Sequence, residues 1–370
     1  MKRLISYSVF ALLSLVGTAL YAQKADLATP LPQVKIEGTQ MLSITSSITN
    51  EEYDLYINLP RDYGDTSKTF PVAYLLDGQW DFPLLQAIYG SQYYDGFIPS
   101  MIVVGITWSG DNANYDSLRA GDLTPTHFVY VPQSGGAPKF LQFIKTELIP
   151  FIESKYRVDK NDRTLIGSSL GGLFTLYTLF HEPTLFDRYV MTSPALTWDN
   201  GVIYGDEKDF AEKKMAVSGR LFMGVGAYED TTTFLNFVQL MKSRNYSGLS
   251  IEGRVLPGVG HSGTKALGYT WGLQYVFEPP PFSIEPATLE QYAGEYGAPQ
   301  GGTIQLTAED GHLVTVLPGM GKVILYAKDD SHFYAKGFLL RVHFERNRDG
   351  KVTAAHYEMY TGSGTVQKIE

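Results

Sequence analysis

The chain has 370 residues, of which 44% are apolar, and a formal net charge of −9 at pH 7. The length predicts more than one domain, and the apolar fraction is sufficient for a large hydrophobic core. The negative charge argues against nucleic acid or an anionic membrane surface as a partner. The sequence contains no cysteine, which excludes thiol catalysis, cysteine metal sites and disulfides.

The first 22 residues have the pattern of an export signal. Lys2 and Arg3 precede an apolar run over 4–20, and Ala22 is a small residue suited to cleavage after it. Gly17 interrupts the run and no stop-transfer charges flank it, which favours a cleaved signal peptide over a membrane anchor. We therefore expect an exported protein, periplasmic or extracellular in a bacterium, with no stable membrane insertion.

Residues 23–277 have the pattern of an α/β domain. Alternating segments at 34–48 and 53–59 predict an antiparallel pair of strands with one solvated face. Apolar residues recur every three or four positions over 139–156, which predicts an amphipathic helix. Strands buried on both faces are expected at 70–76 and 101–108. Further strands are expected at 163–166, 189–193, 220–226 and 250–256, with helices from 173 and over 234–244. Strands alternating with helices indicate a mostly parallel sheet covered on both faces, with function at the carboxyl ends of the strands.

The pattern changes after the proline-rich segment 278–282, which we interpret as a linker. Residues 283–370 contain short alternating runs, and Asp310-Gly311 and Asp349-Gly350 are favoured hairpin turns. This part predicts a separate small antiparallel β domain, either a sandwich or a barrel.

The five residues 167–171, Gly-Ser-Ser-Leu-Gly, match the G-x-S-x-G pattern with Ser169 at its centre. They lie between an apolar strand and an apolar helix, and a turn this tight requires glycine on both sides of the serine. Such a turn lifts the serine hydroxyl off the end of the sheet and directs the next backbone N–H, that of Leu170, at the same space. The pattern thus predicts a nucleophile and one oxyanion donor.

A serine nucleophile needs a histidine base, which in turn needs an acid. His261 follows a predicted strand in a glycine-rich loop and lies C-terminal to Ser169, as the order Ser…acid…His of α/β-hydrolases requires. For the acid we choose Glu229, which follows the preceding strand. Asp230 is the competing candidate, because adjacent loop residues point in different directions. Asp187 and Asp199 are weaker alternatives.

The second oxyanion donor should come from the loop that follows an earlier strand. Gly78 allows close approach of the backbone, so the N–H of Gln79 is the expected donor.

Aromatic residues predict the character of the substrate pocket. Trp80, Trp108 and Trp198 each fall just beyond the end of a predicted strand, on the rim where Ser169 should open. This rim fits a bulky acyl, aryl or sugar-linked ester, although each tryptophan could equally pack a loop. Arg119 could meet an anionic group of the substrate, or it could pair with Asp122.

Five motifs are spread over residues 34–277: Leu76-Asp77-Gly78, Asp122-Leu123-Thr124-Pro125, residues 167–172, residues 181–186 and Gly260-His261. Together they resemble the putative-esterase family of α/β-hydrolases. The family includes esterase D-type hydrolases, feruloyl esterase modules and enterochelin-type siderophore esterases. Its members usually carry the acid a few residues after a glycine that closes a strand, which supports Glu229.

The tail has two further motifs, at residues 289–296 and 310–313. With these motifs it resembles the small lipocalin-like β domain of many exported hydrolases.

We therefore expect a secreted serine carboxylic-ester hydrolase that works through an acyl-enzyme. It would need no metal or cofactor and would act on a small-molecule or glycan-linked ester of the feruloyl, acetyl or siderophore type. Nothing in the sequence indicates an obligate protein partner. Two alternatives are an acyltransferase with the same triad and a non-catalytic ligand-binding protein on a hydrolase scaffold.

Overall fold

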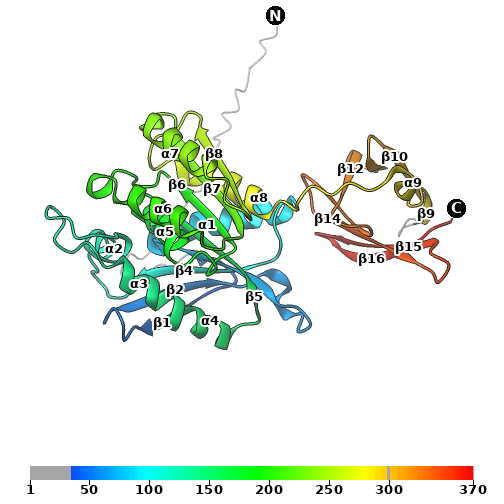
Figure 1. The fold of residues 1–370 in the computed structure, drawn as a ribbon. Coiled ribbons are helices and arrows are strands. Elements are labelled where there is room, and N and C mark those ends of the chain that lie inside the picture. The colour runs from blue at the N-terminus through cyan, green and yellow to red at the C-terminus, as the bar shows by residue number, and fades with distance from the viewer. Residues whose placement is uncertain (1–34, 298–300, 370) are drawn as a thin grey trace, which may run out of the picture. The chain divides into compact units, whose positions relative to one another are not determined.

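The computed structural model describes residues 35–297 and 301–369, which form an α/β domain and a small β domain (Figure 1). The expected signal peptide lies outside the described residues. Among the helices that are described, none has the length and apolar character needed to cross a bilayer.

The α/β domain is built on one sheet of eight strands in the order β1-β2-β4-β3-β5-β6-β7-β8. β1 and β2 pair antiparallel, as do β2 and β4, and the remaining pairs are parallel. The parallel sheet confirms the fold class expected from the alternating pattern. The strands are β1 (Thr39–Thr45), β2 (Glu52–Asn58), β3 (Phe70–Leu75), β4 (Ile102–Trp108), β5 (Val158–Ser168), β6 (Arg188–Thr192), β7 (Gly219–Gly226) and β8 (Leu249–Leu256).

Helices cover both faces of this sheet (Figure 1). The expected amphipathic helix is present as α3 and α4 with a π-helical turn, η2, between them. The helices are η1 (Arg61–Gly64), α1 (Gly78–Tyr94), α2 (Tyr115–Leu123), α3 (Ala137–Phe143), η2 (Ile144–Leu148), α4 (Ile149–Lys155), α5 (Leu170–His181), η3 (Trp198–Asn200), α6 (Val202–Lys213), α7 (Thr231–Ser243) and α8 (Thr264–Phe277).

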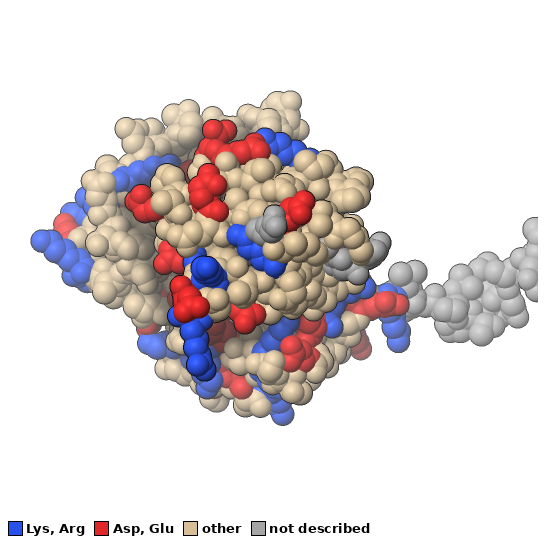
Figure 2. All heavy atoms as spheres, turned by 90° about the vertical axis from the view of Figure 1, so that its right-hand side faces the viewer, with Lys and Arg blue, Asp and Glu red and all other residues tan. Residues whose placement is uncertain are grey.

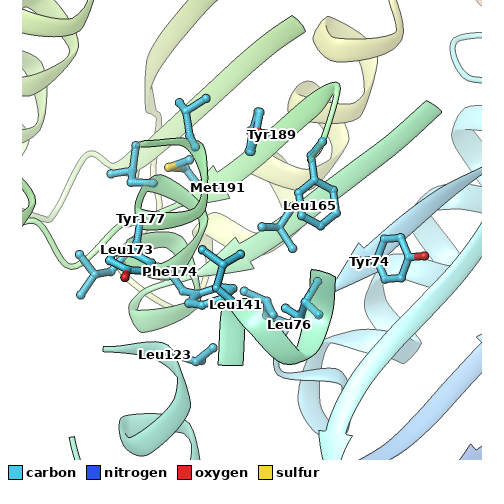
Figure 3. Packing of buried hydrophobic residues seen from close by; sticks show 14 of the residues in the cluster. Tyr74, Leu76, Leu123, Leu141, Leu165, Leu173, Phe174, Tyr177, Tyr189 and Met191 are labelled. Carbon is cyan, nitrogen blue, oxygen red and sulfur yellow. The ribbon is translucent and has the colours of Figure 1, made fainter. Parts of the chain in front are cut away.

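The side chains of the central strands alternate between two hydrophobic cores, because successive residues of a strand point to opposite faces of the sheet. On β6, Tyr189 and Met191 pack under α3 to α7, whereas Val190 faces α1 and α8. Figure 3 shows part of the first core, to which Leu165 of β5 and Leu173 and Phe174 of α5 contribute. Both faces of the central strands are therefore shielded from solvent, which explains their continuous apolar sequences.

The longest helix, α1, was not expected from the sequence. Residues 77–80 are not the loop that we predicted, because α1 begins at Gly78 directly after β3. Its sequence contains Pro83 and two glycines, and its apolar residues lack a clear helical period. Packing against β4 and α8 therefore stabilises a segment whose local propensity is weak.

The small β domain is an eight-stranded meander in sequential order from β9 to β16. A bridge between Tyr296 and Lys368 and a hydrogen bond from Ile369 N to Glu295 O (2.7 Å) join the last strand to the first. The sheet is thus closed as a barrel, one of the two architectures predicted. Its elements are α9 (Pro286–Leu289), β9 (Gly294–Gly297), β10 (Thr303–Glu309), β11 (His312–Leu317), β12 (Gly321–Ala327), β13 (His332–Ala335), β14 (Leu340–Arg346), β15 (Val352–Met359) and β16 (Gly362–Gln367).

Side chains fill the interior of the barrel. On β14, Leu340, Val342 and Phe344 point inward and the residues between them face outward. Both residues of the Asp310-Gly311 turn have positive φ, 49° and 79°, as the predicted two-residue hairpin requires. Basic and acidic side chains are interspersed over a mostly uncharged surface on the face seen in Figure 2.

Asp122 lies in a buried polar cluster of the α/β domain, and Arg119 pairs with Asp77 instead, so the pairing of Arg119 with Asp122 that we considered is wrong. Its Oδ2 accepts hydrogen bonds from the Tyr53 hydroxyl (2.7 Å) and the Trp108 indole N–H (2.8 Å). Trp108 is only 3% exposed, so it is a core residue and does not line the rim where we had placed it. Burial raises the pKa of the Asp122 carboxyl to about 6, although the two hydrogen bonds oppose the shift.

We expect Asp122→Asn to weaken the pH dependence of folding stability. The pKa of Asp122 is higher in the folded than in the unfolded chain, so the folded state binds more protons and stability falls as the pH rises from about 4 to about 6. Asparagine keeps an oxygen acceptor but does not ionise. In urea denaturation, wild type should lose about 2 kcal/mol more than the variant between pH 4.5 and pH 8. Identical pH dependence in the two proteins would contradict this assignment.

Candidate active site

Ser169 occupies a strained turn between β5 and α5. Its φ and ψ are 59° and −116°, a conformation that residues with a side chain rarely adopt. Neighbouring backbone holds it there, because Ser169 N–H donates to Thr192 O on β6 (3.0 Å) and Ser169 O accepts from Leu173 N–H (3.0 Å). This is the geometry expected of a nucleophile elbow.

Glycine is required at position 167 because the helix backbone passes directly over it. A Cβ at Gly167 would lie 2.3 Å from Gly171 O and 2.9 Å from Thr175 Oγ1. Any side chain at this position would therefore force β5 and α5 apart and displace Ser169.

His261 and Glu229 follow β8 and β7, at the same sheet edge as Ser169. Their side chains are in contact, with 2.6 Å between His261 Nδ1 and Glu229 Oε2. Asp230, the competing candidate, points elsewhere and caps α7 by accepting the Thr233 N–H. Of the two adjacent acids, Glu229 is therefore the one that can hold the imidazole tautomer.

The other carboxylate oxygen of Glu229 is also occupied. Oε1 accepts the Gly226 N–H (2.8 Å) and the Ser193 hydroxyl (2.7 Å). Burial raises the pKa of Glu229, but the hydrogen bonds from Ser193, His261 and Gly226 outweigh it, so the pKa lies below its ordinary value. Glu229 is thus ionised at neutral pH, which favours a proton on His261 Nδ1.

Two helix N-termini converge on the elbow. Leu170 is the first residue of α5 and Gln79 the second residue of α1. N–H groups in a first helical turn have no intrahelical acceptor, and the helix dipole adds positive potential there. Asp77 O accepts the N–H groups of Trp80 and Asp81, so these two are not available. The Gln79 and Leu170 N–H groups remain suited to bind an oxyanion.

Two buried ion pairs hold the first turn of α1. Arg119 of α2 donates from Nε and Nη2 to the two carboxylate oxygens of Asp77, at 2.9 and 2.8 Å. Asp81 accepts from Lys265 (2.6 Å) and from the Tyr269 hydroxyl (2.7 Å), both on α8. The turn that carries Gln79 is thus tied to α2 on one side and to the helix that follows His261 on the other.

Trp80 lies in the first turn of α1, and Trp198 is the first residue of the short helix η3. Trp80 is 46% exposed, with its ring against Tyr115 and with the Arg119 guanidinium 5.6 Å from its centroid. Trp198 packs edge-on against Phe128 (5.6 Å), and its indole N–H is buried with no hydrogen-bond partner among the described residues. Arg119 is engaged by Asp77, so its charge is already balanced.

The Ser169 hydroxyl makes no hydrogen bond with any residue in the described part of the chain. The contact between Ser169 and His261 therefore stays a prediction from their shared sheet edge. Within the same described residues, no cluster of His, Asp and Glu side chains could hold a metal ion.

Sequence reasoning missed Ser193 and both ion pairs. Ser193 could have been noticed, because it directly follows β6 at the functional edge of the sheet. The Asp77–Arg119 and Asp81–Lys265 pairs join residues 42 and 184 positions apart, and no local pattern indicates such contacts.

The doubly covered parallel sheet and the serine elbow define the α/β-hydrolase fold. Residues 46–239 match the family described as putative esterase, and residues 278–367 match DUF3471, a domain of unknown function. The family match covers more than half of the chain. The chain therefore belongs to the putative esterase family.

Known relatives support this placement. The chain is 32% identical over 182 residues to the ferri-bacillibactin esterase BesA of Bacillus subtilis, covering 45% of this chain and 62% of the relative. It is 34% identical over 164 residues to a siderophore enterobactin esterase of Emericella nidulans, covering 40% and 54%. In both comparisons the match spans less than two thirds of the relative's length.

Solved structures share the fold. The crystal structure of the BES protein from Bacillus cereus aligns with a TM-score of 0.62 at 26% identity, covering 67% of this chain and 98% of that protein. An IroE-like serine hydrolase from Shewanella oneidensis aligns with a TM-score of 0.57, also at 26% identity, covering 67% and 82%.

We expect Gly167→Ala to destabilise the protein by at least about 2 kcal/mol, since the added methyl overlaps backbone that cannot move freely. Gly205→Ala is the matched control, because Gly205 lies exposed in α6 with nothing within 4 Å of an added Cβ. The control should stabilise by about 0.5–1 kcal/mol through helix propensity. Urea denaturation of both variants measures the difference. Equal stabilities would mean that the turn is looser than described.

Proposed function

We propose that the protein is a serine carboxylic-ester hydrolase in which Ser169, His261 and Glu229 act as a catalytic triad. The observation that carries the proposal is the 2.6 Å contact between Glu229 and His261 at the sheet edge where Ser169 occupies a strained turn. Membership of the putative esterase family supports the same reaction class.

In the proposed mechanism, His261 Nε2 takes the proton of the Ser169 hydroxyl while Oγ attacks the ester carbonyl carbon. The resulting oxyanion binds the Gln79 and Leu170 N–H groups, and ionised Glu229 stabilises the imidazolium. The C–O bond to the alcohol then breaks, and the alcohol leaves with the proton from His261. Water, activated by the same imidazole, releases the acid from the acyl-enzyme and restores Ser169.

For the substrate we propose an ester of the siderophore type. The relatives named as esterases of ferri-bacillibactin and enterobactin favour this class over feruloyl and acetyl esters. An exposed Trp80 beside the oxyanion turn supplies an aromatic surface for a bulky, flat acyl group. Export through the N-terminal signal, to the periplasm or beyond, is part of the same proposal and rests on the sequence.

The first experiment measures hydrolysis of p-nitrophenyl esters of increasing chain length, and of enterobactin, by the full chain. Ser169→Ala should lower kcat by at least about 10³-fold, because nucleophile and base act as a unit. Ser168→Ala is the matched control, since this adjacent hydroxyl is buried against Thr192 (2.9 Å), and it should retain kcat within a few fold. Wild type that cleaves none of these esters, or Ser169→Ala with normal turnover, would refute the hydrolase proposal.

The choice of acid is tested by two isosteric changes. Glu229→Gln should lower kcat by about 10²–10⁴-fold, because the amide cannot stabilise the imidazolium. Asp230→Asn should leave kcat within twofold, because asparagine caps a helix as well as aspartate does. The reverse order of effects would assign the acid to Asp230.

A further inference from the structure

Ser193 is a buried serine held in an unfavourable backbone conformation beside the site. It directly follows β6, the strand between those that carry Ser169 and Glu229, and is 4% exposed. Its φ is +46°, where residues with a Cβ are strained. A hydrogen bond from Ser193 N–H to Gly224 O on β7 (2.7 Å) keeps it there. Such strain persists only where surrounding contacts enforce it, and it clusters at functional sites.

The Ser193 hydroxyl connects the acid to the histidine loop. Oγ donates to Glu229 Oε1 (2.7 Å) and lies 3.0 Å from Thr264 Oγ1. The Thr264 hydroxyl in turn donates to the carbonyl oxygen of His261 (2.6 Å). The hydroxyl groups of Ser193 and Thr264 thus link the Glu229 carboxylate to the backbone of His261 at the start of α8.

These contacts divide the two oxygens of the Glu229 carboxylate. Oε1 is fixed by Ser193 and by the Gly226 N–H, which leaves Oε2 directed at His261. Glu229 lies outside the strands, in the turn between β7 and α7, and its side chain has more rotatable bonds than an aspartate has. A carboxylate on a flexible side chain in a turn needs a further hydrogen bond, in addition to that with His261, to keep one orientation. The titratable group that faces it is His261.

We propose that Ser193 is a positioning residue for the triad acid: its hydroxyl fixes one carboxylate oxygen of Glu229 and thereby directs the other at His261 Nδ1. The proposal rests on the hydrolase function proposed above and adds a fourth side chain to its machinery. Ser193 does not touch the reacting atoms and acts entirely through Glu229.

The test begins with Ser193→Ala and Ser193→Gly, both of which remove the hydroxyl, while glycine also relieves the backbone strain. Each should lower kcat for p-nitrophenyl butyrate about tenfold with KM within twofold, because one hydrogen bond to a charged acid is lost. The loss of activity at acid pH that comes from protonation of Glu229 should begin at a higher pH than in wild type, because Glu229 protonates more readily without this donor. In a Glu229→Gln background the same changes should have no further effect, since Ser193 acts through Glu229.

Ser46→Ala is the matched control. Ser46 is 1% exposed and its hydroxyl also donates to a glutamate, Glu147 (2.6 Å), but it lies between β1 and β2. Its loss should change neither kcat nor the pH profile. If wild type is active and Ser193→Ala has the same kcat and pH profile, the proposal for Ser193 is overturned while the hydrolase function stands. Wild-type behaviour of Ser193→Gly alone would also overturn it, because backbone strain would then explain the alanine effect.

A second measurement does not depend on turnover. In ¹H NMR, the downfield signal of the His261 Nδ1 proton, identified by its absence in His261→Ala, reports its hydrogen bond to Glu229. We expect this signal to move upfield or broaden in both Ser193 variants and not in Ser46→Ala. If wild type hydrolyses no ester, the hydrolase function is refuted, but this signal still tests whether Ser193 positions Glu229. A signal that is unchanged in the Ser193 variants would refute the positioning role.

Discussion

The parallel hydrogen bonding that joins β5, β6, β7 and β8 determines where the proposed nucleophile, acid and base lie. Each of these strands ends at the same edge of the sheet, and each is followed by one polar residue of the site: Ser169, Ser193, Glu229 and His261. The parallel register thus places residues that lie up to 92 positions apart in sequence at one edge of the sheet. If one strand slipped by a residue, its inward side chains would turn to the opposite face and the site would be lost.

Burying the polar groups at this edge costs free energy of desolvation. Hydrogen bonds and ion pairs between these groups offset that cost. Glu229 accepts from a hydroxyl and a backbone N–H and faces an imidazole. Asp77 and Asp81 are each nearly covered and each meets a cation. A buried ion pair adds little net stability, because desolvation offsets the attraction, but breaking one is strongly destabilising. Their value lies in geometry, since they hold the first turn of α1 in one position.

The small β domain depends mainly on local sequence features, unlike the α/β domain. Alternation along its strands separates a filled apolar interior from a polar exterior, and local turns such as Asp310-Gly311 set the register of neighbouring strands. Its contacts are mostly between consecutive strands. For this reason the sequence predicts an antiparallel β domain here, with a barrel as one of two architectures. Side chains such as Tyr292 and Phe344 pack in its interior.

By itself, the sequence determined the fold class, the serine turn and the candidate base, because these depend on periodicity, glycine positions and strand order. It favoured Glu229 but left Asp230 as a competing candidate for the acid. It also missed α1 and Ser193, and it placed Trp108 on the rim. Only the tertiary structure separated the two acids, since adjacent loop residues differ by where the backbone turns and not by type. It also buried Trp108 against Asp122 and joined Arg119 to Asp77. These choices depend on contacts between distant segments, which no local pattern encodes.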